Sequence, residues 1–199
     1  MIIHQIFIEI PEVGYTDIPS NPIWLEAFYQ NVLNKREVKV WYEKDIKKLI
    51  EEHYPQYKVF ISIFPNKFWL IDFARCLILH KHGGVYMDLD TSLLTDPNLD
   101  EKALIGYYSD AKGDIKPNND FIYFKDREMY IEFAEWCLMR MRLCNMNVNW
   151  LCRRQLHIVG SRSLVAFVKS KGMFRQFTGY RRGSEATWLR LYDKKYKKK

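Results

Sequence analysis

Residues 66–90 place an apolar helix pattern, a pair of glycines and an apolar strand pattern in direct succession. The helix pattern has apolar residues at helical spacing: Phe68, Ile71, Ala74, Leu77 and Ile78. Gly83 and Gly84 then supply a helix stop. A strand follows at once, with Val85, Met87 and Leu89 alternating with polar or amphipathic residues. This helix–turn–strand unit restricts the chain to folds in which helices pack on a sheet.

Similar patterns alternate along the rest of the chain. Strands are predicted at about 2–8, 38–42, 85–90, 103–107 and 121–124. Helices are predicted at about 22–32, 43–53, 66–82, 127–142 and 161–171, with Ser20 and Ser161 as N-caps. The stretch 57–64 fits either a strand or a helix, and 173–199 reads as irregular or a short helix. We therefore expect an α/β fold, one Rossmann-like domain with a mainly parallel central sheet flanked by helices.

The composition fits one globular domain followed by a basic tail. The chain has 199 residues, of which 48% are hydrophobic and 28% charged, which argues against disorder. Removing five C-terminal lysines from the net charge of +7 leaves +2. We expect a domain at 1–192 and a tail or linker at 193–199. A basic tail can also bind nucleic acid or an anionic membrane, but no basic-aromatic module elsewhere indicates a nucleic-acid partner.

The cysteines and the N-terminus indicate a reduced, soluble protein. No C-x-x-C occurs among the four cysteines, and Cys76 lies within an apolar helix pattern. The spacing of Cys144, Cys152 and His157 fits no zinc motif, and His157 is interpreted as structural. The first apolar run ends at Glu9, too early for a signal peptide, and no stretch is long enough for a transmembrane segment. The expected location is the cytoplasm.

Asp88 and Asp90 are the clearest candidates for chemistry. In an extended strand, side chains two residues apart share a face, roughly 6.5–7 Å apart along the chain. Two carboxylates so close repel each other, and a divalent cation removes that cost. Their hard oxygen ligands favour Mn²⁺ or Mg²⁺, which could bridge to a diphosphate. The carboxyl ends of strands in α/β sheets are also where ligands gather.

Asp72 and Arg75 lie three residues apart on the preceding helix and so share one face. Such a pair on a surface contributes only a few tenths of a kcal/mol. Because the helix is apolar at most other positions, we expect this charged pair to face a polar site.

These elements together resemble the sugar-binding region of DXD-containing glycosyltransferases. That group includes glycosyltransferase family 32, with its yeast-type mannosyltransferases, and the catalytic domain of large clostridial glucosylating toxins. The shared pattern is Asp-x-x-Arg, an apolar helix, Gly-Gly-x-Tyr and then Asp-x-Asp. Residues 2–7 also resemble the family's first strand, and weaker similarity continues through 119–122 and 159–161. Small viral and bacterial members of this type also lack membrane anchors, and for a viral member the location would be the host cytoplasm.

The resemblance implies a GT-A fold and metal-dependent transfer from a nucleotide diphosphate sugar, with UDP-sugars favoured. It further implies retention of the anomeric configuration and a glycan or protein acceptor. Its site residues map onto Asp88 and Asp90 for Mn²⁺ or Mg²⁺ and diphosphate, and Asp72 and Arg75 for the donor sugar or ribose. The same mapping assigns Tyr86 to the pocket wall, Phe7 to base stacking, Asn118 or Asn119 to the reacting sugar, and Trp188 to closure over the diphosphate.

The chain departs from the family pattern at two places. The usual Thr-Gly-Pro segment is Val159-Gly160-Ser161 here. Relatives have a His and a Ser-Trp pair near the C-terminus, whereas this chain has Thr187-Trp188 and no later His. The third metal ligand is therefore unassigned, with Ser184 and Glu185 as candidates.

Two other functions remain open from the sequence. A metal-dependent nucleotidyltransferase or phosphohydrolase also uses paired carboxylates, and a non-catalytic binding module could use the basic tail. The segment Tyr107–Asn119 is a candidate acceptor or lid region on composition. The oligomeric state is not determined by the sequence.

Overall fold

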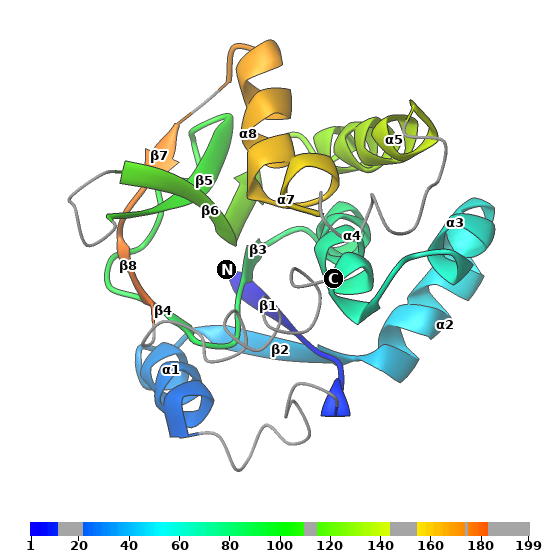
Figure 1. Ribbon diagram of the computed structural model, residues 1–199. Helices are drawn as coiled ribbons and strands as arrows, with labels where there is room; N and C mark the ends of the chain where they lie inside the picture. The colour runs from blue at the N-terminus through cyan, green and yellow to red at the C-terminus, as the bar shows by residue number, and fades with distance from the viewer. Residues whose placement is uncertain (12–21, 110–114, 144–154, 174, 183–199) are drawn as a thin grey trace.

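A six-stranded sheet with strand order β2-β1-β3-β6-β5-β7 forms the centre of the fold (Figure 1). The computed structural model describes residues 1–11, 22–109, 115–143, 155–173 and 175–182. The strands are β1 (Ile2–Phe7), β2 (Glu37–Tyr42), β3 (Val85–Met87), β5 (Ala103–Ser109), β6 (Ile115–Phe124) and β7 (Gln176–Phe177). Because β6 alone runs against its neighbours, the prediction of a mainly parallel sheet is confirmed.

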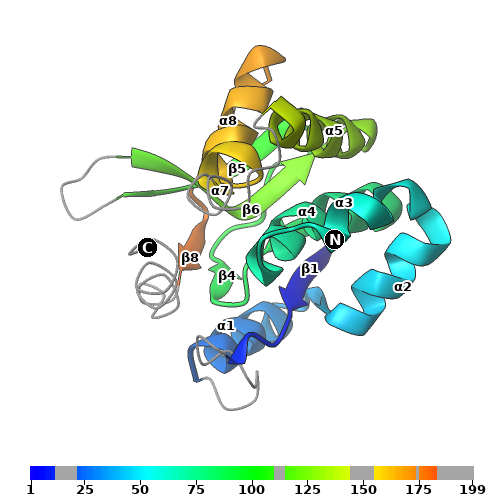
Figure 2. The same ribbon diagram turned by 45° about the vertical axis from the view of Figure 1, so that its right-hand side comes forward.

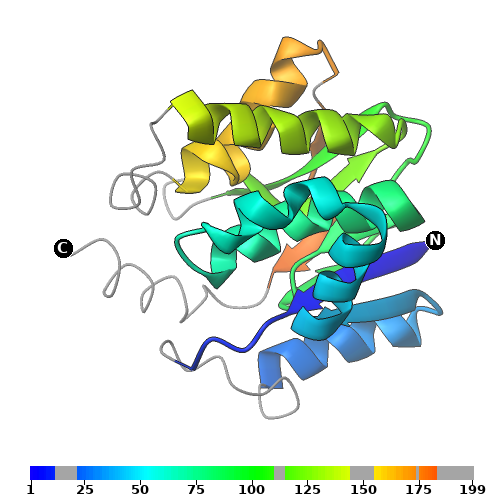
Figure 3. The same cartoon turned by 90° about the vertical axis from the view of Figure 1, so that its right-hand side faces the viewer.

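Helices and a small second sheet cover the two faces of this central sheet. The helices are α1 (Pro22–Leu33), α2 (Glu43–His53), η2 (Pro55–Tyr57), α3 (Lys58–Ser62), α4 (Lys67–His82), α5 (Glu128–Leu143), α7 (Gln155–Ile158) and α8 (Ser161–Ser170). One face packs against α2, α4, α5 and α8, of which α2 and α5 lie toward the viewer in Figure 3. The other face packs against the two-stranded sheet of β4 (Thr91–Leu93) and β8 (Tyr180–Arg182). Figure 2 shows β1 running between α4 and α1.

Helix α4 is buried along most of its length. Its N-cap Asn66 accepts a hydrogen bond from the backbone N–H of Phe68 at 3.0 Å. At the other end Gly83 and Gly84 have φ of 69° and 77°, the left-handed conformations that favour glycine. A Cβ on Gly84 would lie 2.5 Å from the carbonyl oxygen of Ile2. The predicted helix start and stop are therefore confirmed, and the turn brings β3 directly alongside β1.

Several sequence predictions need correction. The strand predicted at 85–90 ends at Met87, because the chain turns at Leu89 and Asp90. The cap of α8 is Gly160, and Ser161 is the first helical residue. Residues 176–182, predicted as irregular or helical, contain β7 and β8, whose short strands form through pairing with β5 and β4. The ambiguous stretch 57–64 is largely helical.

Other predictions lie outside the described residues. These are the cap Ser20, the cysteines Cys144 and Cys152, the ligand candidates Ser184 and Glu185, Trp188 and the tail at 193–199. Within the described residues, Cys76 and Cys137 are buried free thiols. None of the described helices combines the length and the apolar character that crossing a membrane needs.

His4 is buried in β1 and makes the stability of the fold depend on pH. Its Nδ1 accepts a hydrogen bond from the indole N–H of Trp41 at 3.0 Å. Burial lowers the pKa of His4 from 6.5 to about 4, and the nearby His82 contributes to the shift. Because the unfolded chain takes up this proton first, the stabilisation is complete above the unfolded pKa and is lost as pH falls.

We predict that the free energy of unfolding falls by about 2–3 kcal/mol between about pH 6.5 and about pH 4 through His4 alone. Asn at this position keeps an acceptor for Trp41 without titrating. Chemical denaturation across this pH range should therefore give a shallower dependence for His4→Asn than for the parent chain. His53→Asn, at an exposed position, is the matched control and should keep the parent slope. Equal slopes for the parent chain and His4→Asn would contradict the prediction.

Candidate active site

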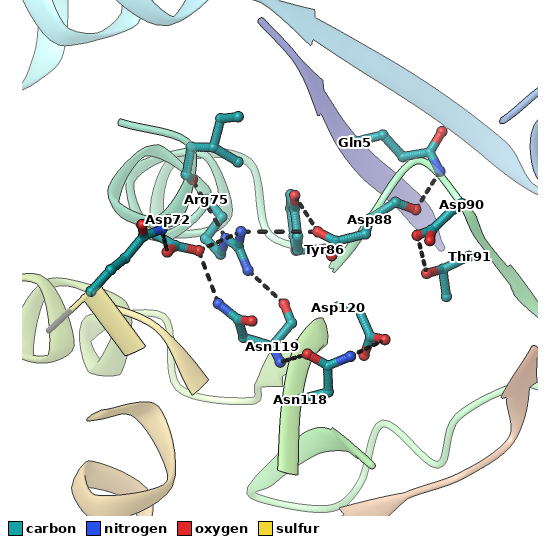
Figure 4. Close-up of polar contacts among 12 residues, drawn as sticks. Gln5, Asp72, Arg75, Tyr86, Asp88, Asp90, Thr91, Asn118, Asn119 and Asp120 are labelled. Carbon is teal, nitrogen blue, oxygen red and sulfur yellow. Dashed lines mark hydrogen bonds and ion pairs between the residues drawn. The ribbon is translucent and has the colours of Figure 1, made fainter. Parts of the chain in front are cut away.

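The segment after β3 forms a tight turn that carries Asp88 and Asp90 (Figure 4). The backbone N–H of Thr91 donates to the carbonyl oxygen of Asp88 at 3.1 Å. The side-chain amide of Gln5, buried in β1, donates to the same oxygen at 3.1 Å. The N–H of Asp88 donates to the carbonyl oxygen of Asp120 in β6 at 2.9 Å. Neighbouring strands therefore hold the backbone of this turn on both sides.

The two carboxylates of the turn differ in exposure and in partners. The Asp88 side chain is 26% exposed, and its Oδ1 accepts a hydrogen bond from the Tyr86 hydroxyl at 2.8 Å. Asp90 is more buried, and its Oδ1 accepts from the Thr91 hydroxyl at 3.3 Å. The strand geometry predicted for them, with both side chains on one face of a strand, is wrong because Asp90 lies in a turn. They nevertheless emerge at the same strand end, two residues apart.

Beneath this turn, Asp72 and Arg75 form a buried ion pair on α4. Arg75 Nη2 lies 2.7 Å from Asp72 Oδ1, and the two side chains are 5% and 8% exposed. An exposed pair at this spacing would be weak, but burial makes an unpaired charge here costly. As expected, this charged pair faces a polar site, the turn that carries Asp88 (Figure 4).

The Arg75 guanidinium connects three elements. Its Nη1 donates to the carbonyl oxygen of Asn119 in β6 at 2.6 Å, and Nη2 lies 3.9 Å from Asp88 Oδ1. The guanidinium carbon sits 4.3 Å from the centre of the Tyr86 ring, a cation–π distance. Burial lowers the pKa of Arg75, but Tyr86, Asp72 and Asp88 together raise it above its ordinary value. Arg75 is therefore a permanent cation between the two carboxylates.

Asp72 accepts hydrogen bonds on both oxygens. Asn119 Nδ2 donates to Oδ1 at 2.9 Å, and Gln155 Nε2 from α7 donates to Oδ2 at 2.7 Å. Burial raises the pKa of the Asp72 carboxyl, while the Arg75 charge and the two amides oppose that rise. Gln155 was missed in the sequence because it lies 83 residues from Asp72 at the start of a short helix. No local pattern marks such a residue.

A second polar group lies beside the turn, on β6. Asp120 is fully buried, and it accepts hydrogen bonds from the Asn118 side-chain amide and from the Tyr180 hydroxyl. A Cβ on Gly106 would lie 2.6 Å from both the Asp120 carboxylate and the Tyr180 hydroxyl, so a side chain at this strand position would displace both groups. The amide of Asn118 is thus held by Asp120, whereas the amide of Asn119 is turned toward Asp72.

Phe7 lies at the same edge of the sheet, at the end of β1. Its ring makes edge contacts with Trp24 and Tyr42, and it packs in one cluster with Leu89 of the turn. The ring is 5% exposed, whereas Tyr42, its register partner on β2, is 45% exposed. The structure thus brings six predicted residues to one edge: Phe7, Asp72, Arg75, Tyr86, Asp88 and Asn119. Asp90 joins them in the turn, and Trp188 lies outside the described residues.

The donor set suits a hard divalent cation that binds together with a substrate. Within the described ranges, His, Cys, Asp and Glu side chains form no group of three that could hold a metal ion. Asp88 and Asp90 offer carboxylate oxygens only. Mg²⁺ commonly binds through one or two carboxylates and completes its shell with waters and phosphate oxygens. The residues present fit a cation of that kind.

Comparisons with known proteins show what the segment carrying this site is similar to. Residues 21–109 match the family described as the glycosyltransferase sugar-binding region containing a DXD motif. An uncharacterized glycosyltransferase, L373, of Acanthamoeba polyphaga mimivirus is 31% identical over 116 residues, which cover 55% of this chain. The match spans 42% of that viral protein, so this chain corresponds to less than half of its length.

Solved structures show the same fold. The PaToxG glycosyltransferase has a TM-score of 0.53 at 16% identity, over 85% of this chain and 69% of that one. A transferase variant with two Cys-to-Ser substitutions has a TM-score of 0.50 at 13% identity, over 93% of each chain. The predicted GT-A-like fold is confirmed, and the predicted resemblance to DXD-containing glycosyltransferases is confirmed over residues 21–109, which match their sugar-binding region.

We predict that Arg75→Met lowers the free energy of unfolding by about 3–5 kcal/mol near neutral pH, because it leaves Asp72 buried without its cation. Without Arg75 the pKa of Asp72 rises further. A raised carboxyl pKa destabilises the folded state above the unfolded pKa, so the deficit should shrink as pH falls toward about 4. Denaturant unfolding at both pH values measures this.

Lys48→Met is the matched control, because that lysine is 74% exposed and pairs with Glu52 at 3.8 Å. Its effect should stay below about 1 kcal/mol. A deficit for Arg75→Met that is equally small, or that does not change with pH, would contradict a charged pair at the floor of the site.

Proposed function

We propose that this chain is a glycosyltransferase that binds a nucleoside diphosphate sugar at the carboxyl edge of β1 and β3. The observation that carries the proposal is the placement of Arg75. This buried cation joins Asp72, at the floor, to Asp88, at the more exposed rim. The sugar-binding family match over residues 21–109, a range that contains all three residues, supports the proposal.

Asp88 and Asp90 would hold Mn²⁺ or Mg²⁺ against the donor diphosphate. When bound, such a cation supplies Lewis-acid stabilisation of the departing nucleoside diphosphate. The chain's own contribution is orientation. Gln5 and Asp120 fix the backbone of Asp88, and the Tyr86 hydroxyl fixes one oxygen of its carboxylate, which leaves the partly exposed side chain aimed at the rim.

Asp72 can contribute one further acceptor position to the donor sugar. A carboxylate offers about four lone-pair positions. Arg75 and Asn119 use two at Oδ1, and Gln155 uses one at Oδ2. A sugar or ribose hydroxyl that donates to Oδ2 would take the fourth. This refines the sequence-based role of Asp72, while Arg75 acts through Asp72 because its guanidinium is already engaged by Asp72, Asn119 and Ile71.

Transfer with retention, a UDP-sugar donor and a glycan or protein acceptor complete the proposal. They derive from the family resemblance. In a front-face reaction the acceptor hydroxyl would enter beside the departing phosphate, on the side of the Asp88 rim. The base would meet Phe7 and the exposed ring of Tyr42, which lie in register at the ends of β1 and β2.

We predict that a thermal-shift panel of nucleotide sugars will raise the Tm with one base and sugar, and more strongly with Mn²⁺ or Mg²⁺ present. Ligand at about 100 times its Kd stabilises a protein by about 2.7 kcal/mol. The stabilising donor is then assayed for products. Release of a nucleoside diphosphate supports a glycosyltransferase, and release of pyrophosphate would indicate a nucleotidyltransferase instead.

We predict that Asp88→Asn and Asp90→Asn each lower kcat/KM for that donor by about hundredfold or more, because each removes a charged ligand from the diphosphate site. The metal-dependent part of the thermal shift should fall in parallel. Asp100→Asn is the control, since its side chain is 94% exposed. Full activity and unchanged metal dependence in both Asp88→Asn and Asp90→Asn would exclude this assignment.

A further inference from the structure

We propose that Gln155 is a positioning residue for the donor, acting through Oδ2 of Asp72. Its side-chain amide holds the oxygen that carries the remaining acceptor position, and so sets the direction in which a sugar hydroxyl can bind. This inference rests on the proposed function and adds a residue that lies outside the matched sugar-binding region at 21–109.

The contact is short and comes from a distant part of the chain. Gln155 Nε2 lies 2.7 Å from Asp72 Oδ2, a distance typical of a hydrogen bond to a charged acceptor. Asp72 itself is 7% exposed, so most of its hydrogen bonds come from protein donors. The other oxygen, Oδ1, is already held by Arg75 and Asn119 from α4 and β6. Gln155 is therefore the contact that α7 contributes to the floor of the site.

The backbone at Gln155 is itself held in place. The N–H groups of Val159 and Gly160 both donate to its carbonyl oxygen at 3.0 Å. The rest of α7 is anchored at His157, whose carbonyl oxygen accepts from Arg140 Nε at 3.0 Å and whose Nε2 lies 2.9 Å from Arg162 Nη1. Because α7 is fixed to both α5 and α8, its first side chain is a rigid support for Asp72.

A rigid donor at Oδ2 has a specific consequence for binding. The Asp72 carboxylate could otherwise rotate about its terminal torsion, which has a broad energy profile. The Arg75 cation and two amide donors, which come from three elements, hold its plane and so set the direction of the remaining acceptor position. Removing the Gln155 amide leaves Oδ2 without its protein donor, and the site then loses orientation rather than charge.

The test compares Gln155→Ala and Gln155→Glu with the parent chain, using the donor found in the nucleotide-sugar panel. Gln155→Ala should lower kcat/KM by about tenfold or more, the size expected for a hydrogen bond to a charged group. Gln30→Ala, an exposed glutamine on α1, should change it by less than about twofold.

Gln155→Glu gives a readout that a merely structural role would not produce. At about pH 8 the new carboxylate of Gln155→Glu repels that of Asp72, so the activity of this variant should be at least as low as that of Gln155→Ala. At about pH 5.5 a shared proton restores a donor to Oδ2, because two adjacent carboxylates raise one pKa. Activity relative to the parent chain should therefore recover on acidification in this variant, and in Gln155→Ala it should not.

A double-mutant cycle tests whether Gln155 affects kcat/KM through its contact with Asp72. In an Asp72→Asn background the further change Gln155→Ala should cost much less than in the parent chain, since the two residues act through one contact. If the parent chain transfers sugar but Gln155→Ala stays within about twofold, or the two costs simply add, the inference about Gln155 is wrong. If the parent chain releases no nucleoside diphosphate from any donor, the proposed function itself fails.

Discussion

The rest of the site depends on the buried guanidinium of Arg75. Removing such a group from water costs several kcal/mol, which is offset only when its donors and its charge are satisfied. Here Nε, Nη1 and Nη2 reach Ile71, Asn119 and Asp72, and the Tyr86 ring covers its face. These contacts tie α4 to β3 and β6. Together with the hydrogen bonds of Gln5 and Asp120 to the Asp88 backbone, that arrangement positions the turn.

The shared cation also explains why two neighbouring carboxylates have different roles. Asp72 lies within hydrogen-bond distance of Arg75 and is 8% exposed, whereas Asp88 is 3.9 Å away and 26% exposed. The closer carboxylate is neutralised inside the protein and serves as a fixed acceptor. The more distant one keeps part of its charge at the rim, where a cation can meet it. A change in the charge of either one alters the field at the other, so binding at the rim and order at the floor are coupled.

Local signals predicted the parts of this structure that are determined locally. Asn66 and the Gly83-Gly84 pair set the limits of α4, and the family pattern located Asp72, Arg75, Tyr86 and Asp88. The turn at Asp90 was not predictable from alternation, because β3 ends where its pairing with β6 ends at Met87. The strands β7 and β8 have two and three residues and form only through their partners. Gln155 reaches Asp72 across 83 residues, a contact that only the assembled fold creates.

The floor of the site is continuous with the hydrophobic core. On α4, Asp72 and Arg75 are flanked by Phe73, Ala74 and Cys76, which are all buried in the same cluster as the central sheet. A substitution at the floor therefore changes packing and chemistry together, and a loss of activity there does not by itself identify a role. The rim and α7 are different, because Asp88 and Gln155 approach the floor from outside this cluster. Function can be separated from stability at those two positions, where a side chain touches the floor without supporting the core.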